Sequence, residues 1–521
     1  MSTFADEQFL APEVNNFVNQ SIEYLACRQP IASTSCNYIK VAPSNGGQYT
    51  NKSDFVEFRI NSQHNSFIDG TKTKLNFEFT ATSTNPTANT TAFDLYSQGS
   101  AMLMFKRYTV ISNGETLEDV TDANKILHMM TKLYTSKSQI NSSPSVQDLY
   151  ANETQGAVGG QGTGRALSSV AALPPVATTQ KVSCPIALSA LFGPSARKSI
   201  PIGMLRNGLI VRFYFTDRLS EVVYAQDPVT GNTITIGNDS SYSVKNVSLE
   251  VKTIRYDDAT FENIKNNLKT NDLEWDATTF ISNVVSANPA TPSVRLLLTN
   301  SNYRDVKSVY CQSWYSSQTP GKSMPYQSIF PGLYQSNVLV NGDPVNSRNI
   351  GISDLTAIKN SIPQTVMNLQ TTTRASNEIL NTESQLASPI GGDDIDPADP
   401  VDADQILIGY SNYVPTTLAA NDYPVNGPNA VPDQGLTGNF GNNGAGVGID
   451  PPNYYWGLST LSSNDKSREL TGRDFRSKQV VLQMDRFNSI VASLDQVIQG
   501  VLVVGVKYHL DVVSGLLTRT L

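Results

Sequence analysis

The segment CPIALSALFGPSARKSIPIGMLRNGLIVRFYFT (residues 184–216) decides the fold class of this chain. A short helix-like piece leads into Ile200-Pro201-Ile202-Gly203, and a strictly alternating segment follows. One face of that segment is wholly apolar and consists of Leu209, Val211, Phe213 and Phe215. Alternation with a period of two is typical of a β-strand with one buried face. The segment therefore predicts the wall of a β-structure and not a reaction centre.

The length and composition of the chain indicate two all-β domains. At 521 residues the chain exceeds the roughly 250–300 residues at which single cores stop growing. Only 16% of the residues are charged, while Asn, Ser, Thr, Gly and Pro are abundant. This composition favours strands joined by many turns over amphipathic helices.

The first half of the chain predicts strands, one helix and a long loop. Strands are predicted by alternation or by apolar runs in four segments: 74–80, 102–111, 208–216 and 244–254. Asn113-Gly114 predicts a turn, and a helix is expected after it. The apolar side of that helix consists of Val120, Ala123, Leu127, Met130 and Tyr134. Residues 151–180, rich in Gly, Ala and Ser, predict a long exposed loop.

The second half repeats this plan. Its predicted strands are 293–298, 306–315, 337–345, 479–485 and 501–512, and in the last of them Val504, Val506, Tyr508, Leu510 and Val512 share one face. Residues 352–387 are compatible with a helix, and 391–450, dominated by Asp, Pro, Gly and Asn, predict a second long loop. The repetition predicts an all-β chain of two consecutive β-sandwiches with short helices and long loop insertions. We expect an N-terminal arm over 1–40, a first sandwich over 41–262 and a second over 263–521.

Two motifs resemble the double jelly-roll major capsid proteins of icosahedral double-stranded DNA viruses. Residues 105–130, FKRYTVISNGETLEDVTDANKILHMM, resemble the strand, Asn-Gly turn, acidic pair and helix near the middle of that family's first jelly roll. Residues 184–216 resemble its short helix, its Ile-Pro-Leu-Gly-like element, here IPIG at 200–203, and the strand that follows. Within the family, the chain is most similar to capsid proteins of polinton-like viruses and virophages.

The resemblance implies a structural virion protein with two consecutive jelly rolls. Members of the family form homotrimeric, pseudo-hexameric capsomers that tile an icosahedral shell. The implied partners are neighbouring capsomers, penton and minor capsid proteins and, where one exists, an internal membrane. In such a capsomer, loops 151–180 and 391–450 would form outer towers. The alternative is that they are surface loops with no partner.

The charge and the N-terminus limit the partners and the location. A net charge of −8 argues against direct nucleic-acid binding, which needs clustered Lys and Arg. The first 25 residues lack the basic end and apolar centre of a signal peptide. We therefore expect synthesis in the host cell interior and incorporation into a virion capsid. The four cysteines, Cys27, Cys36, Cys184 and Cys311, are too few and scattered for a disulfide framework.

An amphipathic helix is predicted behind Pro12. Its apolar residues recur at helical spacing and are Val14, Phe17, Val18, Ile22 and Leu25. We expect this helix to pack on its own domain or on a neighbouring subunit, and the alternative is contact with a membrane or another protein. By analogy with the family, this segment makes an inward contact.

No enzyme motif or cofactor site is expected. The three histidines, His64, His128 and His509, lie in different predicted elements without metal-binding spacing. Gly321-Lys322-Ser323 lacks the first glycine of a phosphate loop, because Ser316 occupies that position. A glycoside hydrolase would need two carboxylates at a defined separation, which a sequence does not reveal.

Two further segments are candidate binding sites. The acidic residues Asp393, Asp394, Asp396, Asp399, Asp402 and Asp404 form a weak candidate calcium loop. They lack EF-hand spacing, and a solvated acidic loop is the alternative. The aromatic residues Tyr454, Tyr455 and Trp456 would be exposed in the main alternative function, a carbohydrate-binding β-sandwich protein. They equally suit a core or a subunit contact.

Overall fold

The computed structural model describes the central part of the chain and its C-terminal strands. The described residues are 35–84, 93–134, 148–149, 176–193, 196, 198–226, 233–234, 236–237, 239–270, 273–288, 291–299, 303–315, 333–344, 350–351, 456–459, 474–486 and 496–520. The predicted N-terminal helix, the helix-compatible segment 352–387 and the loop 391–450 lie outside them.

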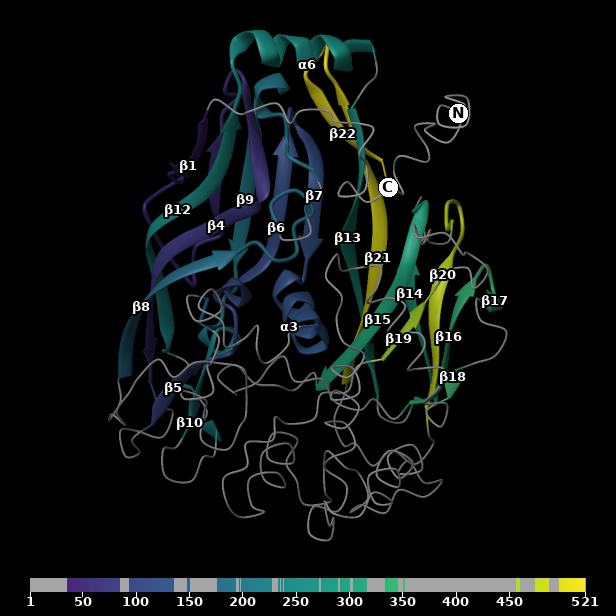
Figure 1. The fold of residues 1–521 in the computed structure, drawn as a ribbon. Helices are drawn as coiled ribbons and strands as arrows, with labels where there is room; N and C mark the ends of the chain where they lie inside the picture. The colour runs from purple at the N-terminus through teal and green to yellow at the C-terminus, as the bar shows by residue number, and fades with distance from the viewer. Residues whose placement is uncertain are drawn as a thin grey trace, which may run out of the picture.

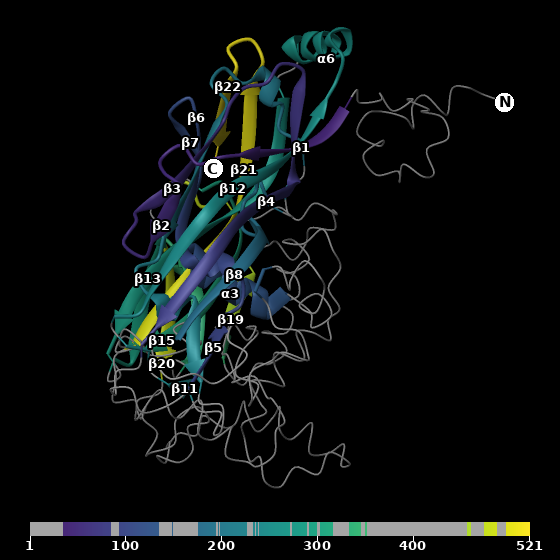
Figure 2. The ribbon, with the colours of Figure 1, turned by 90° about the vertical axis from the view of Figure 1, so that its left-hand side faces the viewer.

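The first half of the chain forms a sandwich of two antiparallel sheets. Its eight main strands are β1 (Ser35–Val41), β3 (Phe55–Ile60), β4 (Ser66–Ser83), β6 (Phe105–Ser112), β7 (Glu115–Thr121), β8 (Val176–Pro185), β9 (Leu209–Phe215) and β12 (Ser241–Arg255). One sheet has the order β1-β12-β4-β8 and the other the order β3-β9-β6-β7. Figure 2 shows the long strands β4 and β12 running diagonally along the first sheet. Short strands complete this half: β2 (Gln48–Thr50) pairs with β12, and β5 (Asp94–Ser97), β10 (Val223–Gln226) and β11 (Thr233–Ile234) form a sheet of their own.

The second half forms another sandwich beside the first (Figure 1). Its eight main strands are β13 (Leu273–Ala287), β14 (Ser293–Thr299), β15 (Asp305–Tyr315), β16 (Leu333–Val340), β17 (Asp343–Pro344), β19 (Trp456–Ser459), β20 (Val480–Arg486) and β21 (Gln496–Asp511). The sheets have the orders β13-β21-β15-β19 and β14-β20-β16-β17. In addition, β18 (Ile350–Gly351) pairs with β16, and β22 (Leu516–Thr520) pairs with β21.

The two sandwiches have the same topology. When the eight main strands of each half are numbered in chain order, both halves give one sheet of order 1-8-3-6 and another of order 2-7-4-5. Eight antiparallel strands in two facing sheets are the architecture of a jelly roll. The predicted all-β fold of two consecutive jelly rolls is therefore confirmed.

Both jelly rolls close their fourth and fifth strands with the same tight turn. Asn113-Gly114 joins β6 to β7 with φ angles of 51° and 85°, and Asn341-Gly342 joins β16 to β17 with φ angles of 54° and 92°. Positive φ at both central residues defines a type I′ turn, which Asn-Gly adopts with the least strain. The chain thus uses one local signal at equivalent places in the two halves.

Helices occupy the connections between strands. Among the described residues, the α-helices are α3 (Ala123–Tyr134) and α6 (Asp258–Thr270), and the short 3-10 helices are η1 (Ala101–Met104), η2 (Ile202–Met204) and η3 (Leu219–Glu221). Helix α6 links the two jelly rolls and lies across one end of the first, at the top of Figure 1. Asp257 caps its first turn by accepting a hydrogen bond from the Thr260 amide, and the side chain of Phe261, in the same helix, is fully buried. None of the described helices has the length and apolarity that crossing a membrane requires.

One apolar cluster covers the interior of the first jelly roll and the face of the second that packs against it. In the first, alternate residues of β4, β9 and β12 point inward, and aromatic rings such as Phe58, Phe105 and Phe213 fill the space between the sheets. The same core continues onto the second jelly roll through Trp275, Tyr508 and their neighbours. One face of the second jelly roll is therefore packed against the first, and the two share apolar surface that water would otherwise reach.

Several predicted boundaries were wrong. Helix α3 begins at Ala123, because Val120 pairs with Tyr108 in the sheet and Asp122, with a φ of 51°, ends strand β7. The stretch from Met102 begins as η1, so its strand starts only at Phe105.

Two further predictions around strand β8 were also wrong. Residues 176–180 are not loop, because they pair with β4 as the start of β8. Between Ile186 and Gly193 the chain forms turns and not the short helix that the sequence predicts.

Candidate functional site

The residues singled out in the sequence fall mainly outside the described part of the chain. This applies to the N-terminal helix with Val14 and Leu25, to the acidic run from Asp393 to Asp404, and to Tyr454 and Tyr455. Trp456 begins strand β19, where its backbone pairs with Cys311 of β15. The calcium loop and the aromatic cluster therefore stay predictions, and the described surfaces become the candidate functional site.

The first of these surfaces is the seam, the contact between the first jelly roll and the β13-β21-β15 face of the second. Near α3, Ser282 Oγ donates a 2.9 Å hydrogen bond to Asp122 Oδ2. The Lys125 ammonium lies 4.2 Å from the centre of the Trp314 ring, a distance typical of a cation–π contact. The beginning of α3 is therefore fastened to β13 and β15.

The seam is fastened a second time at the turn between β21 and β22. The Gly515 carbonyl oxygen accepts hydrogen bonds from the Arg206 amide (3.1 Å) and from Asn113 Nδ2 (3.3 Å). Gly515 has a φ of +68°, and a Cβ there would lie 2.8 Å from the Met204 carbonyl oxygen. Only glycine allows both the positive φ and this close approach. The Asn-Gly turn of the first jelly roll thus also anchors the second.

A buried carboxyl group lies within the seam. Glu118 of β7 is fully buried. Its Oε2 accepts from Ser189 Oγ (2.6 Å), and its Oε1 accepts from the Leu191 amide (2.8 Å) and from the Tyr508 hydroxyl (3.2 Å). Burial raises the pKa of Glu118 to about 7, against the opposing effect of these hydrogen bonds. One side chain therefore joins β7, the turn segment 186–193 and strand β21.

A glycine allows the turn segment to reach Glu118. A Cβ at Gly70, inside β4, would lie 1.8 Å from the Leu191 carbonyl oxygen. The register between β4 and β12 shifts at this point, between the pairs Lys74–Glu250 and Asp69–Lys252. A bulge at a glycine is a common way to admit a second backbone close to a strand.

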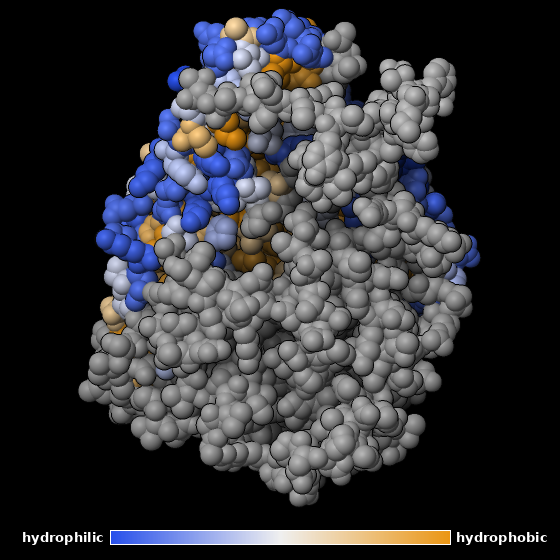
Figure 3. Space-filling view, viewed as in Figure 1, coloured by the Kyte–Doolittle hydropathy of each residue, from blue (hydrophilic) through white to orange (hydrophobic). Residues whose placement is uncertain are grey.

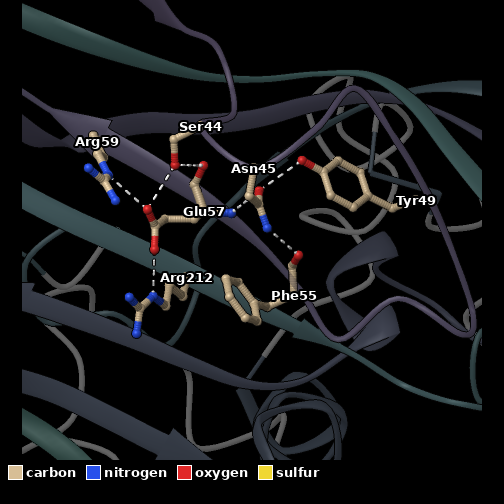
Figure 4. A network of polar contacts seen from close by, with 7 residues as sticks. All are labelled: Ser44, Asn45, Tyr49, Phe55, Glu57, Arg59 and Arg212. Atoms are coloured by element: carbon tan, nitrogen blue, oxygen red, sulfur yellow. Dashed lines mark hydrogen bonds and ion pairs between the residues drawn. The ribbon is translucent and has the colours of Figure 1, made fainter.

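The second candidate surface is the outer face of the sheet β3-β9-β6-β7 (Figure 4). Its centre is Glu57, which is 5% exposed and pairs with Arg59 and Arg212, each at 2.8 Å. The loop after β1 covers it, because Ser44 Oγ donates to Glu57 Oε1 at 2.8 Å. Burial tends to raise the pKa of Glu57, but the hydrogen bonds from Arg59, Arg212 and Ser44 outweigh it and hold the pKa at about 2. Glu57 is therefore ionised at neutral pH.

Aromatic rings and arginines extend this network across the sheet. The Arg212 guanidinium lies 5.4 Å from the Phe55 ring centre, and that of Arg107 lies 5.2 Å from the Tyr214 ring centre. Arg107 also donates two hydrogen bonds of 2.7 Å to Asp119. Together they form a rigid outer face rich in the Arg and Tyr side chains that are enriched in protein–protein contacts.

The described residues contain no candidate metal site. Among them, no group of three or more His, Cys, Asp or Glu side chains could hold a metal ion. His64 lies on the surface 3.9 Å from Asp258 and beside Phe261. Cys36, Cys184 and Cys311, the cysteines in the described ranges, are free thiols.

The end of the molecule that carries α6 has a distinct surface. Figure 3 shows apolar residues just beneath α6, within an otherwise mostly hydrophilic region. The turn between β21 and β22, which lies below α6 in Figure 1, exposes Val513 (77%) and Leu516 (39%). Strands β8 and β19, which follow the two long insertions in the chain, begin toward the opposite end (Figure 1).

No family model matches the sequence of this chain, and no curated protein matches it.

Solved structures do resemble it over nearly its whole length. The Faustovirus major capsid protein matches with a TM-score of 0.53 at 11% identity, covering 96% of this chain and 95% of that one. A chain in the cryo-EM structure of the Sputnik virophage matches with a TM-score of 0.52 at 11% identity, over 97% and 92%. The mavirus major capsid protein matches with a TM-score of 0.51 at 10% identity, over 98% and 95%.

This chain has the fold of viral major capsid proteins. The resemblance to double jelly-roll capsid proteins, stated from two short motifs, is confirmed at the level of fold. The motif at 105–130 contains β6, its Asn-Gly turn, β7 and the start of α3, and the motif at 184–216 contains η2 and β9. Both motifs contribute to the double jelly roll, and the first supplies Glu118 and Asn113 to the seam.

Sequence reasoning missed the buried carboxyl groups at these two surfaces, Glu57 and Glu118. Glu57 carries a weak signal, since Phe55, Glu57 and Arg59 alternate with apolar residues and so share the outer face of β3. Glu118 follows Leu117, and a register shift in the β6–β7 pairing turns both side chains inward. Alternation alone assigns neighbouring residues to opposite faces, so it could not have found Glu118.

Proposed function

We propose that this chain is the major capsid protein of an icosahedral double-stranded DNA virus, with a structural and not an enzymatic role. The observation that carries the proposal is the repeated strand order, 1-8-3-6 and 2-7-4-5, in two jelly rolls that pack apolar side chains against each other. The likeness to the Faustovirus and mavirus major capsid proteins over more than nine tenths of each chain supports it.

In this proposal three chains form a homotrimeric, pseudo-hexameric capsomer. Two rigidly packed sandwiches of one topology give a trimer six similar units, so that one chain can meet neighbours in a near-hexagonal lattice. The implied partners are neighbouring capsomers, penton and minor capsid proteins and, where present, an internal membrane. Direct binding of nucleic acid is not expected at a net charge of −8.

The domain division is part of the proposal. We propose an arm within residues 1–40, a first jelly roll within 41–262 and a second within 263–521. The link through α6 supports the second boundary. Strand β1 begins at Ser35 and pairs with β12, so the part of the arm that is free to contact a partner would precede it.

The two insertions would lie at the outer end of the capsomer. Support comes from the starts of β8 and β19, which lie toward the end opposite α6. The α6 end, with Val513 and Leu516 exposed, would then face inward. We also propose that the chain is synthesised in the host cell interior and then incorporated into a virion capsid.

The first experiment is light scattering of the purified protein, followed by negative-stain imaging of the same fraction. A particle three times the 56.6 kDa chain mass with a pseudo-hexagonal outline is the expected result. A stable monomer that never assembles, even with the other virion proteins, would contradict the proposal.

The N-terminal arm has its own test. Deletion of residues 1–27 removes Val14, Phe17, Val18, Ile22 and Leu25 but leaves β1 intact. Folded trimers that no longer form shells are expected if this segment makes the inward contact. Normal shell assembly by the shortened chain would assign the inward contact to another segment.

A further inference from the structure

Glu118 connects three separate segments at the seam. Its carboxyl oxygens accept hydrogen bonds from Ser189 and Leu191 of the first jelly roll and from Tyr508 of the second. The Ser189 hydroxyl in turn accepts from the Phe192 amide at 2.9 Å, which fixes the turn segment 186–193. A change in the charge of Glu118 therefore acts on both jelly rolls at once.

The groups that face Glu118 supply hydrogen bonds but no ion pair. Among the described residues, no Lys or Arg lies within ion-pair distance of its carboxyl group. From β6, the buried Tyr108 hydroxyl donates to the Leu188 carbonyl oxygen at 2.7 Å. From β21, Tyr508 is neutral, because burial raises its pKa well above the ordinary value despite the attraction of Arg519 on β22. Asp119, next along β7, is paired with Arg107 on the outer face. Ionised Glu118 would thus be a buried and uncompensated charge, which is costly.

The protonated carboxyl group fits the same surroundings without that cost. Its hydrogen on Oε2 can be donated to Ser189 Oγ, while Oε1 continues to accept from Leu191 and Tyr508. The hydrogen bonds that Glu118 makes are then all formed between neutral groups.

We propose that Glu118 is a proton-operated latch between the two jelly rolls, which holds the seam closed when the carboxyl group is protonated and loosens it when the proton is lost.

The direction of the pH effect follows from the burial of this carboxyl group. Its pKa of about 7 in the folded chain lies above the ordinary value of 4.5. The folded state therefore binds more protons than the unfolded state between these two values. The stabilising effect is complete below the ordinary value, declines as pH rises, and is lost above about pH 7. A capsomer built from this chain would have its tightest seam in mildly acidic solution.

Hydrogen exchange of the full-length protein, followed by mass spectrometry, tests the latch. The key variant is Glu118→Gln, whose amide makes the bonds of the protonated carboxyl group at every pH. Wild type and variant should exchange alike at about pH 5.5, whereas at about pH 8.5 wild-type peptides from 115–121 and 501–511 should exchange about tenfold faster. Comparison at the same pH cancels the intrinsic pH dependence of exchange. If wild type and variant exchanged equally at both pH values, the proposal would be overturned. It would also be overturned if wild-type peptides from β4 exchanged faster by the same factor at high pH, because that would indicate global unfolding.

Tyr508→Phe provides a second readout, which also serves if the Gln variant fails to fold. Removing the hydroxyl takes away a bond that favours the ionised carboxylate, so the midpoint of the transition should move to higher pH. If the Tyr508 hydroxyl had only a structural role, the variant would exchange faster at every pH, and the pH midpoint of the transition would stay as in wild type.

Asp148→Asn is the matched control. Asp148 is another buried carboxyl group, bonded to Ser100 Oγ (2.6 Å) and to the Ala101 amide (3.0 Å) inside the first jelly roll, and burial raises its pKa to about 8. Its substitution should change the pH dependence of thermal unfolding but leave the pH response of peptide 501–511 as in wild type. Loss of that response in Asp148→Asn would assign the effect to buried carboxyl groups in general and reject the latch at Glu118.

Discussion

The two jelly rolls share a topology but differ at the equivalent pair of their second and seventh strands. In the first, Glu57 of β3 lies opposite Arg212 of β9, and the pair is covered by Ser44. In the second, Arg295 of β14 lies opposite Gln483 of β20, and Arg295 is exposed. The strand order is therefore independent of the buried ion pair, which is a feature of one surface and not of the fold.

The cores differ as well. The first is built around aromatic rings in mutual contact, such as Phe105, Phe213 and Phe215, whose centres lie 5.1–5.2 Å apart in the pairs that Phe105 makes. The second is aliphatic around Leu482, with Leu296 and Val338 paired to it on either side. In β21, residues 498–506 are all buried, although the strand has two faces. The second jelly roll therefore depends on the first for cover, while the aromatic core of the first is largely its own.

The largest expected effect tests this dependence. Phe213→Ala removes a ring that contacts Phe58, Phe105 and Tyr108 and should lower the free energy of unfolding by about 4 kcal/mol. The three tryptophans, Trp275, Trp314 and Trp456, lie on strands of the second jelly roll. Because apolar side chains of both jelly rolls pack together at the seam, the fluorescence transition of these tryptophans should shift together with the circular dichroism transition.

Leu482→Ala is the matched substitution in the second jelly roll. It should lower the free energy of unfolding by about 3 kcal/mol, whether unfolding is followed by fluorescence or by circular dichroism. If the tryptophan transition of Phe213→Ala stayed at the wild-type midpoint, the jelly rolls would unfold independently, and the apolar contact at the seam would not couple their stabilities.

Glu57→Gln should have the next largest effect. The folded pKa of about 2 lies below the ordinary value of 4.5, so ionised Glu57 stabilises the protein above that value and the contribution is lost as pH falls toward 2. The variant should be about 2–3 kcal/mol less stable at neutral pH. In urea unfolding curves, the difference in the free energy of unfolding between the variant and wild type should shrink steadily as the pH falls below 4.5, the ordinary pKa of Glu.

The equivalent place in the second jelly roll supplies the control. Arg295→Gln removes an exposed charge and should change stability by less than about 0.5 kcal/mol at any pH. A comparable loss of stability in this variant would mean that the two outer faces are energetically alike, and that the Glu57–Arg212 pair does not distinguish the first jelly roll from the second.

Alternation and turn motifs predict many of the strands and one tight turn of this fold. They do not predict the features that depend on a neighbouring strand or on the other jelly roll. Period-two alternation located β9 and β12, and Asn113-Gly114 marked a turn. By contrast, the strand character of Val120 depends on its partner Tyr108, and the second buried face of β21 depends on the other jelly roll. Alternation within one strand does not reveal the pairing of Val120 with the neighbouring strand, and the residues that cover β21 lie far from it in the chain. The sequence shows Glu118 only as one of an acidic pair in a motif. Its burial depends on a register shift between β6 and β7 and on contact with Tyr508, which lies 390 residues further along the chain.

The Asn-Gly turns should behave alike in the two jelly rolls. A Cβ at Gly114 or Gly342 would meet nothing within 4 Å, so substitution costs only backbone strain at φ values of +85° and +92°. Gly114→Ala and Gly342→Ala should each lower stability by about 1 kcal/mol, measured by thermal unfolding. A much larger effect for Gly114→Ala alone would show that the seam contact of neighbouring Asn113 is sensitive to turn geometry, and would sharpen the difference between the halves.

The smallest expected effect concerns the seam at α3. Lys125→Met keeps the aliphatic stem of the side chain but removes the cation above the Trp314 ring, so that only the cation–π contact is lost. The expected loss is about 0.5–1 kcal/mol, with a change in tryptophan fluorescence of the folded protein, because Trp314 is one of only three tryptophans. Lys106→Met is the control, because Lys106 on β6 pairs with Asp217 on the exposed surface, away from any tryptophan-bearing strand. If both variants left fluorescence and stability unchanged, α3 would be held to the second jelly roll by the hydrogen bond between Ser282 and Asp122 and by apolar packing, and the energetic link between the halves would lie with Tyr508 and Glu118.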